Sequence, residues 1–135
     1  MIFLDTSFLL ACFNNRDVHH YKAIRILHNV AEKKHGAVFM TDYIFNETVT
    51  VSMIKMKDLG IVKWIGNYLL SSLKLIRIEE DIFFDSWKIF QSQKGTRLGF
   101  TDCTTIATMR YNGIDTIATF DKDFTKINDI NCIGL

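Results

Sequence analysis

The sequence contains no proline, so its turns depend on glycine, asparagine and aspartate. Cysteine is scarce: Cys12, Cys103 and Cys132 are odd in number and lack the close spacing of a metal-binding pair. Such a set is typical of a reduced, cytoplasmic protein in which cysteine packs as a small apolar side chain. The four histidines do not have the spacing of zinc ligands either, so we do not expect a zinc site.

Long apolar runs and a strong net charge are also missing. No apolar stretch approaches the roughly 18 residues that a membrane-spanning helix needs, and the amino terminus lacks the basic start of a signal peptide. We therefore expect a cytoplasmic protein with no membrane partner. The formal net charge is only +1, so any binding of nucleic acid must depend on local basic patches.

The composition that is present is that of an ordinary globular protein. The chain has 135 residues, 48% hydrophobic and 23% charged, which predicts a single domain over residues 1–135 with one core. Apolar strand patterns alternate with helical patterns, and this order predicts an α/β domain with a mainly parallel sheet. The predicted strands are 2–4, 37–40, 73–78, 114–120 and 131–135, and the predicted helices are one directly after Asp5 and about 20–34, 42–57, 61–72, 79–91 and 102–112.

Apolar stripes on these helices predict which side faces the core. Lys33 and Lys34 suit the negative end of the helix 20–34. The helix 61–72 carries Trp64 and Tyr68 on a second apolar face, which indicates deep burial or an interface with a partner. The residues predicted to face inward are Tyr21, Ile24, Leu27, Ala31, Val62, Ile65, Leu69, Phe83, Trp87 and Phe90.

The first twelve residues organise this layout. Ile2 to Leu4 form a continuous apolar run, as in a strand buried on both faces, and an apolar helix pattern resumes after Asp5. Asp5 therefore falls at the carboxyl end of a central strand, which is the edge at which open α/β sheets bind ligands. Taken alone, Asp5, Thr6 or Ser7 can equally be an ordinary helix cap.

Three more carboxylates are expected at the same edge. Glu47 lies within the apolar stripe of its helix, where a charge is costly unless it pairs, binds a ligand or reaches out at the edge of the stripe. Asp102 also points inward, and Thr101 is available as the cap in its place. Asp121 follows a predicted strand. Because right-handed crossovers bring the carboxyl ends of parallel strands to one edge, we expect all four acids to share a cleft.

Four carboxylates in one cleft repel one another, which raises their pKa values unless a cation is present. Oxygen ligands without histidine or cysteine favour Mg²⁺ or Mn²⁺ over zinc. These ions pair with phosphate oxygens and lower the pKa of an attacking water, so the expected reaction is hydrolysis of a phosphodiester. Thr6, Ser7, Thr101 and Thr119 flank the acids as hydrogen-bonding neighbours or as ordinary caps. The predicted metal ligands and catalytic residues are Asp5, Glu47, Asp102 and Asp121.

Four motifs that contain these acids resemble those of the PIN domain family: Ile-Phe-Leu-Asp5-Thr-Ser, Asn-Glu47-Thr, Phe-Thr-Asp102 and Ala-Thr-Phe-Asp121-Lys-Asp-Phe. The resemblance covers essentially the whole chain and looks strongest to the VapC-type toxin ribonucleases of toxin–antitoxin pairs. It implies a three-layer α/β/α sandwich and Mg²⁺- or Mn²⁺-dependent endonucleolytic cleavage of RNA by the same four acids. It also implies a frequent homodimer and a cognate antitoxin whose carboxyl-terminal segment covers the active site.

Other residues have secondary roles in this interpretation. Asp123 is expected to be peripheral or part of a salt bridge rather than a fifth ligand. Lys94, Arg97 and Lys122 are candidates for phosphate contacts, although each taken singly is an ordinary solvated side chain. The aromatic pair on the helix 61–72 is expected to contribute to a dimer or antitoxin surface.

Two other classes of function stay open. A PIN-like RNA-processing or RNA-binding module without a toxin role would share the fold, but a module without chemistry has no physical need for four repelling carboxylates. A phosphotransfer domain on a similar sheet is disfavoured, because Ser7 rather than an aspartate stands two residues after Asp5. A receiver domain is disfavoured too, since no convincing phosphoacceptor aspartate or late lysine is present.

Overall fold

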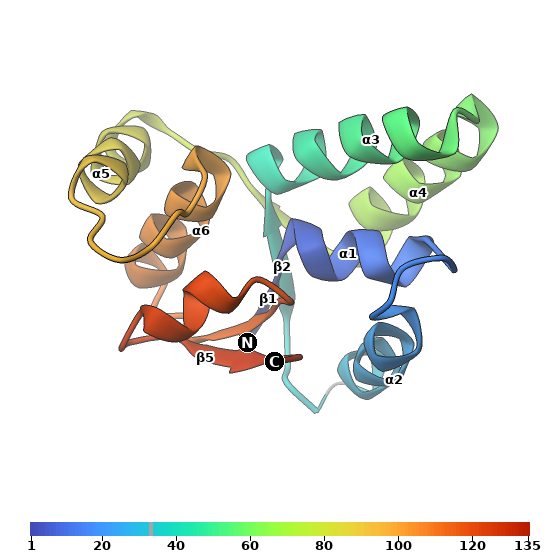
Figure 1. Ribbon diagram of the computed structural model, residues 1–135, viewed down its shortest axis with the longest axis horizontal. Helices are drawn as coiled ribbons and strands as arrows, with labels where there is room; N and C mark the ends of the chain where they lie inside the picture. Colours follow the sequence, from blue (N-terminus) through green and yellow to red (C-terminus); the bar gives the residue numbers. More distant parts are fainter. Residues whose placement is uncertain (33) are drawn as a thin grey trace.

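The computed structural model describes residues 1–32 and 34–135, and in this part of the chain it contains all the strands and helices expected from the sequence (Figure 1). Lys33, expected at the end of the second helix, lies outside the described residues. The elements are β1 (Ile2–Leu4), α1 (Thr6–Phe13), α2 (His20–Ala31), β2 (Val38–Thr41), α3 (Asp42–Met56), α4 (Leu59–Ser72), β3 (Lys74–Ile76), α5 (Glu80–Gln91), α6 (Phe100–Tyr111), β4 (Thr116–Ala118), the 3₁₀ helix η1 (Lys122–Lys126) and β5 (Asn131–Ile133).

The strands form one parallel sheet in the order β3-β2-β1-β4-β5. The chain builds outward from β1 to β3, then returns to the other side of β1 with β4 and β5. Right-handed crossovers put the helices before and after this reversal on opposite faces. Figure 1 shows α1 to α4 on one side of the strands and α5 and α6 on the other. The predicted three-layer α/β/α sandwich is confirmed.

Strand β1 lies at the centre of the core. Ile2, Phe3 and Leu4 are almost wholly buried, because β1 is paired on both edges and covered by helices on both faces. Phe8 on α1 and Phe124 on η1 are fully buried as well. The continuous apolar run at the amino terminus was therefore a correct signal of a buried strand.

In the described residues, no helix has both the length and the apolar character that crossing a bilayer requires.

Helix α2 faces the core with a different stripe from the predicted one. Tyr21 is 85% exposed and Ile24 42% exposed, whereas Ala23 and Val30 are buried. Of the predicted inward residues on this helix, only Leu27 packs partly against the core. The prediction was wrong because it followed the largest side chains, while the helix approaches its neighbours with the small side chain of Ala23.

Helix α5 is also turned relative to the prediction. Its inward face consists of Ile82 and Ser86, and Ser86 can be buried because its Oγ donates to the Ile82 carbonyl at 2.6 Å. The aromatic side chains predicted to face inward are exposed instead. They contact Phe100 at the start of α6, with ring centroids 5.2 to 6.4 Å apart: Phe83, Trp87 and Phe90.

Two helices begin earlier than expected because their caps were not recognised. Asp58 accepts a hydrogen bond from the Ile61 N–H at 3.1 Å, so α4 begins at Leu59, two residues before the predicted start at 61. Gly99, rather than Thr101, is the N-cap of α6. At the start of α3, Thr41 is the N-cap, and its Oγ1 accepts from the Ile44 N–H at 3.1 Å.

Candidate active site

The four predicted acids line a single cavity of about 240 Å³. Asp5 follows β1 and Asp121 follows β4, and these two strands are neighbours in the sheet. Glu47 comes from α3, and Asp102 comes from the first turn of α6. The chain leaves β1 toward one side of the sheet and β4 toward the other, so the cavity lies at the switch point where open α/β sheets bind ligands.

Asp5 is held by three hydrogen bonds on one oxygen. Its Oδ2 accepts from the Ser7 N–H at 3.2 Å, from Ser7 Oγ at 2.6 Å and from Thr119 Oγ1 at 2.8 Å. The bond from the Ser7 N–H makes Asp5 the N-cap of α1, so the capping interpretation is also correct. The other oxygen, Oδ1, is buried and has no hydrogen-bond partner among the described residues. A buried carboxylate oxygen without a partner is costly, and Asp5 is one of the residues that line the cavity.

The two hydroxyls that bind Asp5 are oriented by backbone groups. The Phe120 N–H donates to Ser7 Oγ at 3.0 Å, and the Asp121 N–H donates to Thr119 Oγ1 at 3.0 Å. Each hydroxyl therefore accepts from the backbone and donates its single proton to Asp5. Burial nevertheless raises the pKa of Asp5 above its ordinary value, and the hydrogen bonds from Ser7 and Thr119 oppose that rise only in part.

Glu47 is joined to α1 by a direct hydrogen bond. Thr6 Oγ1 donates to Glu47 Oε2 at 2.6 Å, although the two residues lie 41 positions apart in the sequence. Among the described residues, no basic side chain forms a salt bridge with Glu47. A neutral hydroxyl thus fixes the orientation of this carboxylate and leaves its charge unneutralised.

Asp102 has a capping role that the sequence analysis denied it. Its Oδ2 accepts from the Gly99 N–H at 2.7 Å, which is the half of a capping box that a glycine N-cap, having no side chain, allows at the start of α6. Thr101 does not bond any of the acids; its carbonyl accepts from Thr104 and Thr105. Burial, followed by the negative charges of Asp5, Asp121 and Glu47, raises the pKa of Asp102 to about 7.

Asp121 and Asp123 have different environments. Asp121 Oδ1 accepts from the Asp123 N–H at 2.8 Å, within the turn that begins η1. Asp123 accepts from Lys126 Nζ at 2.6 Å and from the Arg97 N–H at 2.7 Å, and the Lys126 bond holds the pKa of Asp123 below its ordinary value. Asp123 does not line the cavity. The expected salt-bridging role of Asp123 is confirmed.

The donor set of this cavity fits a hard divalent cation. Eight carboxylate oxygens, without histidine or thiolate, suit Mg²⁺ or Mn²⁺, and Asp5 Oδ1 is a buried oxygen that lacks a partner. In the described part of the chain, no three acidic, histidine or cysteine side chains already stand close enough together to hold an ion. Asp102 and Asp121 are each turned toward a local backbone N–H instead, so an ion would have to draw them inward.

Two residues of the cavity were not predicted as site residues. Leu10 and Val51 line it beside the acids and form its apolar wall. Helical spacing could have identified both, because Leu10 is four residues after Thr6 and Val51 is four residues after Glu47. The predicted phosphate contacts Lys94, Arg97 and Lys122 are exposed side chains outside the cavity lining, so they stay a prediction.

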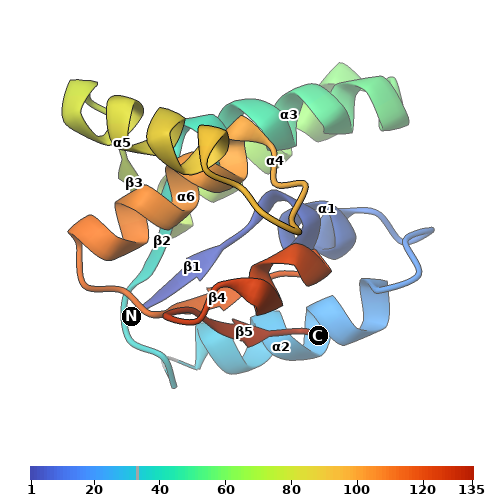
Figure 2. The same ribbon diagram turned by 60° about the vertical axis from the view of Figure 1, so that its left-hand side comes forward.

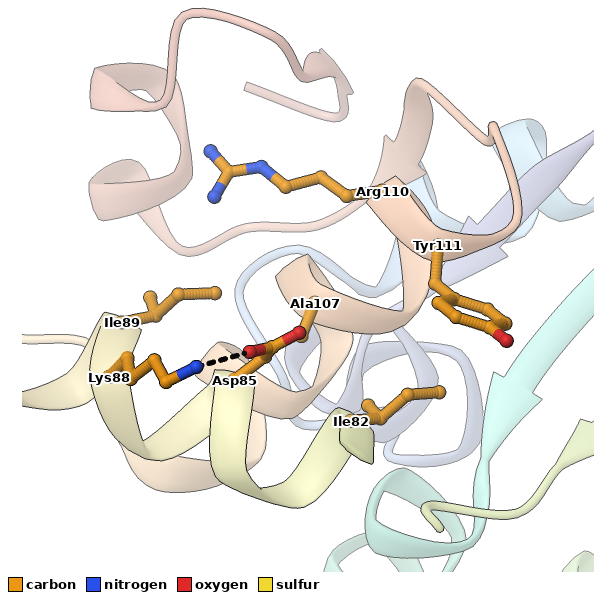
Figure 3. A pocket seen from close by; sticks show the side chains of 7 residues that line it. All are labelled: Ile82, Asp85, Lys88, Ile89, Ala107, Arg110 and Tyr111. Carbon is orange, nitrogen blue, oxygen red and sulfur yellow. Dashed lines mark hydrogen bonds and ion pairs between the residues drawn. The ribbon is translucent and has the colours of Figure 1, made fainter. Parts of the chain in front are cut away.

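A larger cavity of about 460 Å³ lies between α5 and α6, and no residue of the acidic cavity lines it (Figure 3). Its basic groups are already paired. Lys88 Nζ contacts Asp85 Oδ1 at 3.0 Å, and Arg110 Nε contacts Asp129 Oδ2 at 2.7 Å. It therefore offers neither unpaired acids nor unpaired cations for chemistry. The residues that line it are Ile82, Asp85, Lys88, Ile89, Ala107, Arg110 and Tyr111.

These features define a class: a three-layer α/β/α domain with an acidic cavity at the switch point of a parallel sheet. A family model for the PIN domain matches residues 2–130, so the chain belongs to the PIN domain family. The resemblance of the chain to that family is confirmed.

Two relatives similar to this chain in sequence are named as VapC proteins. The chain is 24% identical over 138 residues to a VapC ribonuclease from Archaeoglobus fulgidus, covering 93% of this chain and 86% of the relative. It is 27% identical over 125 residues to the 23S rRNA-specific endonuclease VapC20 from Mycobacterium tuberculosis, and the match covers 93% of this chain and 92% of the relative.

Solved structures show the same fold. The sarcin-ricin loop cleaving toxin VapC20 from M. tuberculosis superposes with a TM-score of 0.84 at 24% identity, over 95% of each chain. A chain of a toxin–antitoxin complex from Klebsiella pneumoniae superposes with a TM-score of 0.73 at 20% identity, over 100% of this chain and 98% of that one.

Proposed function

We propose that this protein is a divalent-metal-dependent endoribonuclease that hydrolyses phosphodiester bonds of RNA, and that it is the toxin of a toxin–antitoxin pair. The observation that carries the proposal is the cavity where Asp5, Glu47, Asp102 and Asp121 meet from four distant segments. The named relatives support the same reaction class, since one is called a ribonuclease and another an rRNA endonuclease. We further propose that the protein acts in the cytoplasm, where its RNA substrate would be found.

We assign the four acids as the residues that would hold Mg²⁺, with Mn²⁺ as a substitute. When bound, such an ion lowers the pKa of an attacking water and offsets negative charge on the leaving oxygen. The chain contributes orientation. Ser7 and Thr119 fix one oxygen of Asp5 and leave the other free for a ligand, and Thr6 fixes one oxygen of Glu47 in the same way. Leu10 and Val51 limit access of water from one side.

The direct test is cleavage of total RNA by the purified protein in the presence of Mg²⁺ or Mn²⁺. We expect discrete RNA fragments with either ion and none with EDTA, because without a cation the four carboxylates repel a phosphate. The names of the M. tuberculosis relative make 23S rRNA, and its sarcin-ricin loop, the first defined substrates to try.

A variant with Asp81 replaced by Asn is the matched control for this test. Asp81 is an exposed acid in the first turn of α5, outside the acidic cavity, so its loss should leave cleavage unchanged. Cleavage that persists in EDTA would contradict the metal requirement. A protein that binds RNA but never cleaves it would instead be the RNA-processing or RNA-binding module that the sequence left open.

We also propose that an exposed aromatic surface on α4 contacts a partner, either a second copy of the chain or an antitoxin. Trp64 is 60% exposed and stacks on Tyr68 with ring centroids 5.5 Å apart. Both rings contact Phe13 of α1 edge to face, at 6.1 and 6.0 Å, which holds them rigid at the surface. Rigid exposed aromatics are typical anchors of protein interfaces.

Replacement of Trp64 by Ser is expected to weaken self-association, or binding to a cognate antitoxin, by about tenfold or more. Sedimentation equilibrium measures the first, and titration with the antitoxin measures the second. Tyr111→Ser is the control, since Tyr111 is an exposed aromatic of α6 that contacts neither Phe13 nor the α4 pair. If the Trp64→Ser protein self-associates and binds the antitoxin as tightly as the parent, α4 is not part of the interface.

A further inference from the structure

Helices α1 and α3 lie side by side and run in the same direction away from the sheet (Figure 1). Pairs of residues that face each other across the two helices recur every four positions on each helix. Thr6 bonds Glu47, and one turn further Leu10 and Val51 line the acidic cavity together. One more turn along, Asn14 and Lys55 line a second cavity of about 400 Å³. The two cavities therefore follow one another along this helix pair, one helical turn apart, and we name the surface made up of both the α1–α3 groove.

The chemistry of the groove changes from one end to the other. It begins at the carboxylates, passes the apolar side chains of Leu10 and Val51, and ends at Arg16 and Lys55 with two neighbouring asparagines. Arg16 and Lys55 are both exposed, and neither forms a salt bridge within residues 1–32 and 34–135.

Several other polar groups at the basic end already form hydrogen bonds within the protein. The Ala11 carbonyl accepts from His20 Nδ1 at 2.8 Å, and the acid nearest in sequence to Arg16, Asp17, accepts from the His19 N–H at 2.8 Å. Asp58, three residues after Lys55, caps α4. Both carboxylates are thus oriented by backbone N–H groups, and among the described residues neither forms a salt bridge with Arg16 or Lys55.

The length of the groove matches a short piece of nucleic acid. Glu47 and Lys55 are eight residues apart on α3, which is about 12 Å at the helical rise of about 1.5 Å per residue. A stacked strand rises about 3.4 Å per nucleotide, so this distance corresponds to about three or four nucleotides. A strand cleaved at the acids would place a backbone phosphate beside Arg16 and Lys55, with a base or ribose against Leu10 and Val51.

We propose that the α1–α3 groove is the track of the RNA strand on one side of the cleaved bond, and that Arg16 and Lys55 hold a phosphate a few nucleotides from that bond. The assignment rests on the proposed ribonuclease function and names how its substrate lies. RNA is favoured over a protein ligand because the order of acid, apolar and cationic groups matches the scissile phosphate, the intervening base and the flanking phosphate.

The test compares Arg16→Ala and Lys55→Ala with Lys74→Ala as the matched control. Lys74 is an exposed lysine at the start of β3, so it lies at the edge of the sheet opposite the acids. Binding of a single-stranded RNA is measured in an Asp102→Asn background, which prevents cleavage, over a range of salt concentrations. We expect each test variant to bind about 3- to 10-fold more weakly, and the salt slope to fall by about 0.7 for each lost phosphate contact.

Cleavage by the otherwise unaltered protein provides the directional readout. We expect Arg16→Ala and Lys55→Ala to lower kcat/KM on a long RNA, and the difference to disappear when four nucleotides are removed from one side of the cleaved bond. Removal of four nucleotides from the other side should leave the difference in place. The Lys74→Ala protein should equal the parent on all three substrates.

Several results would overturn the proposal. If the parent cleaves RNA while Arg16→Ala and Lys55→Ala match it in affinity, salt slope and kcat/KM, the track is wrong and the ribonuclease function stands. If the variants keep their lower kcat/KM on both shortened substrates, the track does not lie on one side of the cleaved bond. Variants that lose affinity for an antitoxin but not for RNA would make the groove a protein-binding surface. A parent that neither binds nor cleaves RNA would remove the proposed function and the track together.

Discussion

Replacement of Asp5 by Asn is expected to reduce metal-dependent RNA cleavage by on the order of 10³-fold, the scale for loss of one preorganised electrostatic group. Asp5 is the most buried of the four acids, and in the described structure it is the only one of them with a fully buried carboxylate oxygen that lacks a partner. An amide at that position would present its NH₂ group to the cavity, so the oxygen available to a cation is lost. Initial rates on a defined RNA measure the effect.

The same substitution should leave the fold intact. The amide oxygen of Asn can still accept from Ser7 and Thr119, so the hydrogen bonds that join β1 to the end of β4 are kept. One negative charge also leaves a crowded cavity, and thermal unfolding in EDTA should therefore occur at a higher temperature than for the parent. Asp81→Asn should alter neither quantity. An Asp5→Asn protein with activity within tenfold of the parent would remove Asp5 from the proposed role.

Without a divalent ion, acidification from about pH 8 to pH 5.5 is expected to stabilise the protein. The folded-state pKa of Asp102 is about 7, whereas its ordinary value is 3.8, so the folded state holds a proton that the unfolded state has released. The resulting stability is full below the ordinary pKa and is lost as the pH rises through about 7. For this single group, the free energy of unfolding should be about 1–2 kcal/mol larger at pH 5.5 than at pH 8.

Added Mn²⁺ should reverse the direction of this pH dependence. The ion binds ionised carboxylates, so its contribution to stability grows as the pH rises, while protonation of Asp102 competes with it at low pH. Denaturant titrations at both pH values, with Mn²⁺ or with EDTA, measure the four free energies. Asp102→Asn is the control that separates this effect from the other effects of pH, which both proteins share. A parent that is more stable at pH 8 than at pH 5.5 in EDTA would contradict the expectation.

The position of the cleft was predictable because it depends on where strands end. The buried run Ile2 to Leu4 fixes β1, and the connection order then brings Asp5 and Asp121 to the same edge. Glu47 was identifiable because a carboxylate interrupts an apolar stripe. The hydrogen bonds within the cavity were less predictable: the flanking role of Thr6, Ser7 and Thr119 was anticipated, but the bond from the Gly99 N–H to Asp102 was not.

Features that depend on how two helices pack could not be derived from one segment at a time. On α5, the largest apolar side chains form one stripe, yet the helix packs through Ser86 and leaves Trp87 45% exposed. The pairing of Leu10 with Val51, and the common cavity of Arg16 and Lys55, require knowing that α1 and α3 run in the same direction. Neither hydrophobic periodicity nor a motif contains that information.

The order of the strands in the sheet has a consequence for how the protein is made. β4 pairs directly with β1, although more than a hundred residues separate them along the chain, and Asp121 follows β4 (Figure 2). A growing polypeptide that has left the ribosome only as far as α6 carries Asp5, Glu47 and Asp102 but lacks the strand that completes the centre of the sheet. Until β4 joins the sheet, the four acids cannot meet in one cavity, so we expect such an incomplete chain to have no nuclease activity.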